Sequence, residues 1–427
     1  MNRTYTVQKN DVLAKISTKF YGVPNKYNLI VNANPQLLGR GKALDGTPLI
    51  NKGDILIIPD ETENIINQTQ KEKIPEKVKS VSDNAISILI DNTLFSFWTE
   101  YSITFEIDTF DTFSFSAPFD SDLQIYREAF RPFNYKSIAI YYGQDLIFIG
   151  VLLADETTLE SNEKSISITG YSKPGILNDC HMPISSFPLE FNNQTLKQIS
   201  PIICKPYGII SSFLASSGNP FEKVSIDIET DIFSFLSGLA EQRGLLISNS
   251  VKGELIYYKP QTGNPVASFK QGELPFMSCS NSFDYQSFYS HITGITQTTE
   301  EKKSASYTYI NNYLVKKGIM RCYNFIAEDT KDSEIKQATL SMAGRMFGES
   351  ASYELTIQGH RDKDGNLLKK NTIVSVLSPG AMIYRETNFL IKSLTMSRNN
   401  EGDITEMELV LPGSYSGQIP EVFPWEE

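Results

Sequence analysis

The chain has 427 residues, of which 40% are apolar and 21% charged, and its net charge at pH 7 is −11. This length is too great for a single hydrophobic core and predicts about two to four domains. The acidic balance, with Lys and Arg scattered along the chain, disfavours a protein that binds nucleic acid by sequence or adheres to an anionic membrane.

Targeting and redox signals are sparse. The polar beginning MNRTYTVQKND has no apolar core of a signal peptide, so we expect a protein made and assembled in a cytoplasm. No apolar run reaches the length of about 18 residues that predicts a membrane span. The four cysteines are far apart and are interpreted as reduced structural residues: Cys180, Cys204, Cys279 and Cys322.

Residues 1–60 have the pattern of a small βααβ unit. TYTVQ alternates like a strand, Asp11 is placed to cap a first helix that ends at Gly22, a second helix follows Pro24, and DILIIP is the return strand. The order of Tyr-x-Val, NDVLAKIS, FYG, LIVNAN and GDILIIP resembles the LysM module. LysM modules bind wall glycans, which raises the question of what the rest of the chain does.

The LysM resemblance implies two glycan-contact loops, one after the first strand and one after the second helix. The residues at these places are Asn10, Asp11, Val12, Asn34 and Pro35. The family usually has Gly-Asp-Thr in the first loop, whereas this chain has Asn10 for the Gly and Val12 for the Thr. A single module also gives weak avidity, so binding to glycan and packing against protein both stay open.

Residues 61–84 are polar and charged and are predicted to be a flexible linker. Residues 85–190 then alternate with period two, with a hairpin at YYGQDLIFIG and no long helix, which predicts a barrel or sandwich.

Residues 191–262 are predicted to be an α+β domain. The first helix contains Pro201, which predicts a kink or a shorter helix. The second is capped by Thr230 or Asp231 and ends at Gly244, and a hairpin follows.

Strands return in residues 263–427, with one helix at about 332–347 and two long strands around NNEGD. The tail GQIPEVFPWEE is interpreted as a docking arm or a loose end. The expected fold class is therefore mainly β with α+β parts.

The chain carries no catalytic motif that we can identify. Its three histidines lack the spacing of a zinc site, and the neighbours Cys180 and His181 are best explained as an incidental pair. DKDGN at 362–366 resembles the start of a calcium loop but lacks its final Glu, which favours a hairpin turn. We predict no catalytic residue, no metal site and no cofactor.

A glycosidase needs only two carboxylates, and these cannot be excluded by inspection. The acidic residues that lie near apolar or aromatic neighbours are Glu229, Glu241, Glu349 and Glu354. Each is explained more simply as a cap or a solvated charge.

Past the linker, the order of segments resembles phage Mu-type baseplate hub proteins, relatives of the T-even hub and of P2-like late-control proteins. The resemblance covers about residues 85–415. It rests on specific segments: NNQTLKQISPIICKPYGI, DIETDIFSFLSGLAEQRGLLISNSVKGELIYYK, GNPVASFK, MRCYNFIAED, LTIQGHRDKDGNLLKKNTIVSV and NFLIKSLTMSRNNEGDITEMELVLPGSY.

This resemblance implies a non-enzymatic hub with two tube-like barrels, at 85–190 and 263–427. Three copies would form a pseudo-hexameric ring between a hexameric tail tube and a trimeric spike. The implied partners are the tube, spike and wedge proteins and the tape measure, within a virion assembled in the host cytoplasm. Asp108 and Asp111 are candidates for the lumen, an ordinary solvated face being the alternative.

Two other classes of protein remain as alternatives: a tail-associated enzyme that processes peptidoglycan, addressed by LysM, and a secreted LysM binding protein. The missing signal peptide disfavours the second.

Overall fold

The computed structural model describes residues 3–9, 11–34, 37, 47–58, 84–91, 93–95, 98–160, 164–296, 304–327, 332, 334–399, 402–415 and 423–426. The chain divides into two compact units, residues 1–75 and 76–427, and each is described by itself. The predicted linker falls outside the described residues except for Asn84.

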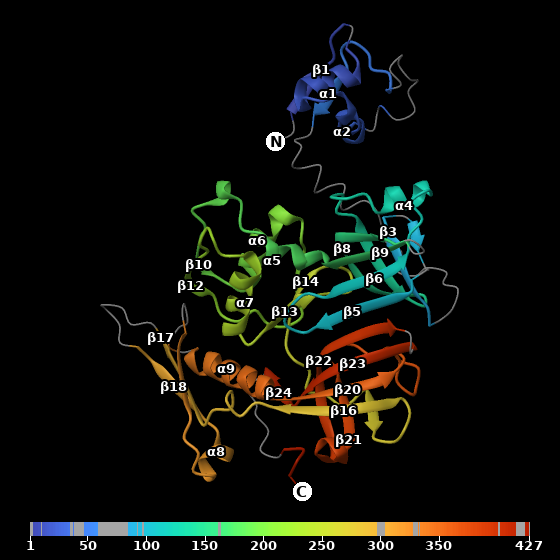
Figure 1. Ribbon diagram of the computed structural model, residues 1–427. Helices are drawn as coiled ribbons and strands as arrows, with labels where there is room; N and C mark the ends of the chain where they lie inside the picture. The colour runs from blue at the N-terminus through green and yellow to red at the C-terminus, as the bar shows by residue number, and fades with distance from the viewer. Residues whose placement is uncertain are drawn as a thin grey trace. The chain divides into compact units, whose positions relative to one another are not determined.

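The N-terminal unit has the predicted order of strand, helix, helix and strand (Figure 1). Its two strands pair antiparallel over a small apolar core. The end of the first helix is confirmed, because Gly22 takes a left-handed φ of 74° and its N–H caps the helix. Its elements are β1 Arg3–Thr6, α1 Leu13–Tyr21, the 3-10 turn Pro24–Lys26, α2 Tyr27–Ala33 and β2 Ile55–Ile58.

The predicted cap of the first helix is wrong. The N-cap residue is Val12, which supplies no side-chain acceptor. The Asp11 carboxylate instead accepts hydrogen bonds from the Tyr5 hydroxyl and the Gln8 N–H, both at 2.8 Å. Asp11 therefore ties the loop to the first strand, and the start of the helix has no side-chain cap.

The larger unit is built around a 13-stranded sheet. Its first half is the predicted strand-rich region, and the YYGQDLIFIG hairpin is confirmed, with Tyr142 opposite Asp145. The elements of this half are β3 Ile86–Ile90, β4 Thr93–Phe95, β5 Glu100–Glu106, β6 Thr112–Pro118, α4 Gln124–Ala129, β7 Ser137–Tyr142, β8 Asp145–Leu159 and β9 Lys164–Ser172.

The second half of the sheet comes from the end of the chain. The predicted long strands around NNEGD are confirmed, with Asn399 opposite Gly402. The strands of this half are β15 Ala267–Lys270, β16 Phe276–Phe283, β20 Ala351–Gln358, β21 Ile373–Ser378, β22 Ile383–Asn399 and β23 Gly402–Val410.

The two halves are joined by main-chain pairing of β5 with β22, in a register that runs from Glu106 opposite Ser393 to Tyr101 opposite Arg398. Figure 1 shows the early strands and the late strands lying side by side at this seam. Segments almost 300 residues apart in the sequence thus share one sheet.

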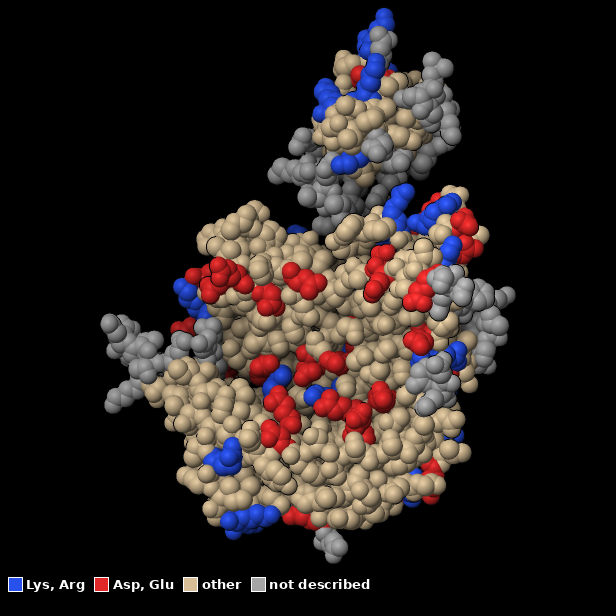
Figure 2. Space-filling model, viewed as in Figure 1, with Lys and Arg blue, Asp and Glu red and all other residues tan. Residues whose placement is uncertain are grey.

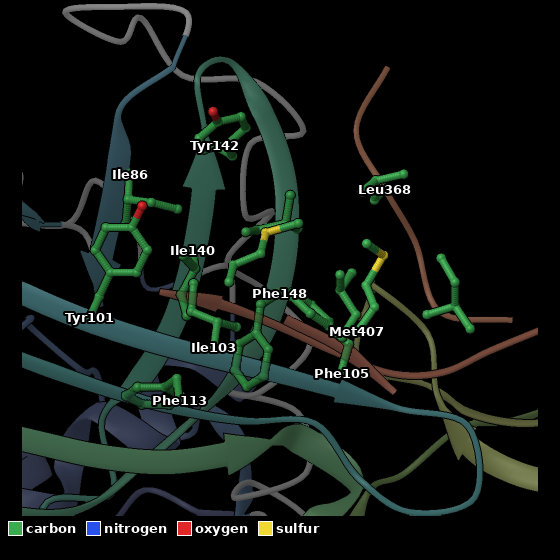
Figure 3. Packing of buried hydrophobic residues seen from close by; sticks show 14 of the residues in the cluster. Ile86, Tyr101, Ile103, Phe105, Phe113, Ile140, Tyr142, Phe148, Leu368 and Met407 are labelled. Carbon is green, nitrogen blue, oxygen red and sulfur yellow. The ribbon is translucent and has the colours of Figure 1, made fainter. Parts of the chain in front are cut away.

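The largest core cluster of the sheet lies on one face of strands such as β5 and β6, in which every second residue is apolar and buried. Figure 3 shows Ile103 and Phe105 of β5 gathered with Phe113, Ile140 and Phe148 of neighbouring strands, and all five are buried. Burying each such side chain contributes about 1.5–3 kcal/mol relative to leaving it exposed.

A smaller α+β layer has its own core. Its hairpin is confirmed, with β13 and β14 antiparallel and β11 parallel to β14. Helix α6 has nine residues and continues through Pro201 to Cys204, so Pro201 does not end it. The elements are α5 Ile176–Asp179, β10 Glu190–Gln194, α6 Leu196–Cys204, β11 Ser211–Phe213, β12 Phe221–Ser225, α7 Ile232–Gln242, β13 Leu246–Asn249 and β14 Leu255–Tyr258.

The cap of α7 is Asp231, whose carboxylate accepts the Ser234 N–H at 2.7 Å. We expect Asp231→Ala to lower the free energy of unfolding by about 1 kcal/mol, since the N–H loses its partner. Urea unfolding measures the loss. Asp227→Ala, an exposed carboxylate just before this helix, is the control and should cost much less.

A third group of elements packs on helix α9. The helix begins three residues later than predicted, and Glu334, just before it, binds Arg243 of the α+β layer at 2.7 Å. The group comprises β17 His291–Thr296, β18 Ser306–Ile310, α8 Asn312–Lys316, β19 Cys322–Ala327, α9 Ile335–Ser350 and β24 Pro412–Tyr415.

Residues 423–426 pack against the core of the larger unit, as a docking arm does. Phe423 is fully buried, and Trp425 stacks on it with ring centroids 4.7 Å apart. The Tyr384 N–H donates to the Pro424 carbonyl, so the arm is also held through the backbone.

Candidate functional site

The face of the sheet opposite the core is polar over eight consecutive strands. Residues directly opposite each other in the register share a face, so the pairing of β16, β20, β23, β22, β5, β6, β9 and β8 traces this surface. We call it the polar face. The same register also places Ile404, Val410 and Ala154 on this face. Its other residues are mostly short hydroxyl side chains and glutamates: Ser278, Ser280, Ser282, Ser352, Glu354, Thr356, Glu406, Glu408, Ser393, Thr395, Ser397, Glu100, Ser102, Thr104, Glu106, Thr112, Ser114, Ser116, Ser165, Ser167, Thr169, Glu156 and Thr158.

The glutamates make this surface acidic. Glu354 and Glu408 lie directly opposite each other on β20 and β23, and Lys392 binds Glu408 at 2.9 Å. Burial, with the neighbouring Asp108 charge, raises the pKa of Glu106. Figure 2 shows Asp and Glu side chains, with a few Lys and Arg among them, gathered over the region where Figure 1 draws β22, β23 and β24.

A shallow groove of about 350 Å³ crosses the polar face between β16 and β22, lined by Ser280, Glu354, Ser393 and Glu408 among others. Within the described ranges, no three His, Cys, Asp or Glu side chains gather in a way that could hold a metal ion. None of the helices described combines the length and apolarity needed to cross a bilayer. The surface is suited to contact with water and to repelling a polyanion.

Of the two residues predicted to line a lumen, Asp111 does not, and that prediction is wrong. The residue is only 3% exposed, and its carboxylate binds Lys370 Nζ at 2.6 Å and Asn249 Nδ2 at 2.7 Å. The loop after β5 turns the side chain inward, which alternation along a strand does not reveal. Asp108 is half-buried in the same loop.

The Asp111–Lys370 pair is the centre of a buried polar cluster, which we call the Lys370 cluster. The Lys370 ammonium also donates to the Glu106 carbonyl and to Ser248, each at 2.7 Å. Burial raises the pKa of Asp111, and the Lys370 charge is the largest influence in the opposite direction. The cluster ties both halves of the sheet to the α+β layer.

A second buried group surrounds His360. Its Nε2 lies 2.7 Å from the Tyr101 hydroxyl, which donates to Asp403 at 2.9 Å, and Arg398 binds Asp403 through two nitrogens. Burial lowers the pKa of His360 to about 4. Burial alone would raise the pKa of Asp403, but the bonds from Arg398 and Tyr101 hold it below its ordinary value.

The glycan-contact candidates that the structure describes are engaged within the N-terminal unit. The Asn34 amide donates to the carbonyls of Ile30 and Ile57 and accepts the Ile57 N–H, with the side chain fully buried. Asp11 is held as described above, and Val12 is half-buried at the helix start. Asn10 and Pro35 lie outside the described residues.

The remaining sequence candidates have structural partners or settings. Glu241 pairs with Arg345 at 3.2 Å. Burial raises the pKa of Cys180, which disfavours a thiolate. Asp362 of DKDGN accepts the N–H groups of Asp364 and Asn366, so the hairpin turn is confirmed.

Comparison with known proteins places this architecture among phage tail proteins. The 43 kDa tail protein of prophage MuSo2 from Shewanella oneidensis has the same fold, with a TM-score of 0.67, 23% identity, and coverage of 77% of this chain and 99% of that one. A tail protein from Neisseria meningitidis MC58 gives a TM-score of 0.66 at 16% identity, covering 78% and 98% of the two chains.

The sequence comparisons point to one family. Residues 174–258 match the family described as "Baseplate hub protein gp44-like, second domain". The curated baseplate hub protein gp44 of Escherichia phage Mu is 22% identical over 337 residues, which are 74% of this chain and 85% of that protein. These matches support a relationship to the gp44-like baseplate hub family.

Proposed function

We propose that the chain is the structural hub of a contractile phage tail, or of a related injection machine, and that it works as a homotrimer in the baseplate of the virion. In this proposal two tube-like barrels, at 85–190 and 263–427, bracket the α+β domain at 191–262. The trimer connects the tail tube to the spike and contacts wedge proteins and the tape measure.

The polar face carries this proposal. It comprises two sets of four antiparallel strands, β16-β20-β23-β22 and β5-β6-β9-β8, joined edge to edge. Two similar sets per copy suit a ring in which three chains match a sixfold tube. The hydroxyl and carboxylate side chains suit the wall of a conduit, since a polyanion such as DNA would not adhere to them.

The N-terminal unit fits the role of a LysM accessory. Residues 1–59 contain eight Lys and Arg but only three Asp and no Glu, so this unit is basic in an acidic chain. Such a charge suits the carboxylates of a bacterial wall polymer. Asp11 and Asn34 would then shape the binding loops from within, and Asn10, Val12 and Pro35 would be the contact positions.

Two measurements test the proposal. Light scattering on the full-length chain, alone and with its spike protein, should give the mass of a trimer, whereas a stable monomer that lyses cell walls would favour the enzyme alternative. Sedimentation with purified peptidoglycan should remove the full-length chain from solution and leave residues 61–427 behind. If both sediment equally or neither does, the N-terminal unit is not the wall-binding element.

A further inference from the structure

The polar face ends in two strand edges that the described part of the chain leaves without a partner. At one end, β16 pairs only with β20. At the other, β8 pairs with β7 only as far as Val151, and its remaining residues have β9 on one side and no described strand on the other. Exposed edges of this kind are ready to pair with another chain.

The two free edges are complementary in direction. All seven pairings from β16 to β8 are antiparallel, so these two strands run in opposite directions. The β16 strand of a second copy can therefore continue the sheet next to β8 without breaking the alternation. Such a contact is head-to-tail and closes into a ring if the rotation allows it.

We propose that β8 of one copy pairs antiparallel with β16 of the next, with Glu156 opposite Ser280. This inference rests on the proposed function and names the joint that would close its ring. The register keeps both hydroxyl-bearing rows on the polar face. At the end of the joint it brings Leu159, which is 72% exposed, to Met277, which is 51% exposed and lies at the register break between Phe276 and Ser278.

The stagger of the sheet supports this register. Within one copy, the series of directly paired residues that starts at Ser278 of β16 ends at Val151 of β8. At the proposed joint, Ser278 of the next copy lies opposite Thr158 instead, further along β8. The offset is close to one residue per strand, which is the stagger of closed barrels whose strands tilt by about 36°.

Two exposed aromatic residues, Phe133 and Tyr135, and a pocket flank the joint. We call the two residues the aromatic knob. The loop before β7 lies next to the start of the free β8 edge, since the Leu152 N–H donates to the Lys136 carbonyl. In this loop Phe133 is 91% exposed and Tyr135 66% exposed, both with positive φ, a conformation that aromatic residues rarely adopt.

The matching cavity lies at the end of β16. It has a volume of about 490 Å³ and is lined by Phe283, Tyr285, Tyr384 and Trp425 among others. In the proposed register the start of the free β8 edge lies next to Phe283, which brings the loop of Phe133 to this cavity. Phe133, an exposed aromatic residue in a backbone conformation that aromatic residues rarely adopt, would thereby be buried in the next copy.

The register predicts one covalent link between copies. Thr157 falls opposite the native Cys279, so full-length Thr157→Cys should form disulfide-linked dimers and trimers on mild oxidation, seen on a non-reducing gel. Glu156→Cys is the matched control, because its side chain points to the polar face and away from Cys279. The double variant Thr157→Cys with Cys279→Ser should lose the link.

The knob is tested separately by Phe133→Asp. We expect it to raise the concentration needed for half-maximal trimer by about tenfold or more, as loss of an interface anchor does. Leu214→Asp, at a residue 70% exposed on the α+β layer, should leave it unchanged. If light scattering shows a trimer but the Thr157→Cys variant forms no disulfide to Cys279, this joint is wrong and the proposed hub function is unaffected. If no trimer forms at all, the proposed hub function is wrong as well.

Discussion

Replacing Lys370 by Met should lower the free energy of unfolding of the larger unit by about 3–5 kcal/mol, because it leaves the Asp111 carboxylate buried without its counter-charge. The Lys370 ammonium has three acceptors, and Asp111 is 3% exposed, so water cannot take the place of the lost partner. Urea unfolding followed by circular dichroism measures the loss.

The neighbouring residue provides the control. Lys369 is exposed, and Lys369→Met should change the free energy of unfolding by less than about 0.5 kcal/mol. The double variant Asp111→Asn with Lys370→Met removes both charges and should recover part of the loss. If Lys370→Met costs no more than Lys369→Met, the cluster does not hold the layers together.

Acid should destabilise the same unit through His360. Its pKa is about 4 in the folded chain against 6.5 when unfolded, so between these values the unfolded chain binds more protons. Stability contributed by the neutral ring is complete above pH 6.5 and is lost as the pH falls towards 4. The difference amounts to about 3 kcal/mol, at 1.36 kcal/mol for each pKa unit.

The comparison with His360→Gln isolates this effect. Gln cannot gain a proton, so the variant should lose less stability than the wild type between pH 6.5 and 4, whereas Asp403 and Glu106 titrate in both proteins. Parallel stability curves for the two proteins would show that His360 does not titrate as proposed. The measurement is again urea unfolding, at closely spaced pH values.

Local signals in the sequence predicted most of the elements. The left-handed Gly22, the YYGQDLIFIG hairpin and the strands around NNEGD depend on residues close together in the chain, and all three are confirmed. The predicted cap of the first helix was wrong, because the Asp11 carboxylate binds the Tyr5 hydroxyl, a contact that spacing along a helix does not reveal.

The long-range features were beyond the sequence alone. The seam between β5 and β22, the Asp111–Lys370 pair and the contact of Tyr101 with His360 each join residues more than 250 positions apart. The alternation of hydroxyl and apolar residues showed that each strand has two different faces. It did not show that eight strands line up to make one surface, nor that the loop after β5 turns Asp111 into the interior.

The seam between β5 and β22 has a mechanical consequence. Six consecutive rungs of backbone pairing, from Tyr101 to Glu106, leave no hinge between the two halves of the sheet. In a ring of such copies the bore would have a width fixed by its number of strands and their tilt. The hub would then act as a rigid collar of constant diameter, and any opening or closing of the channel would have to come from a plug or a cap.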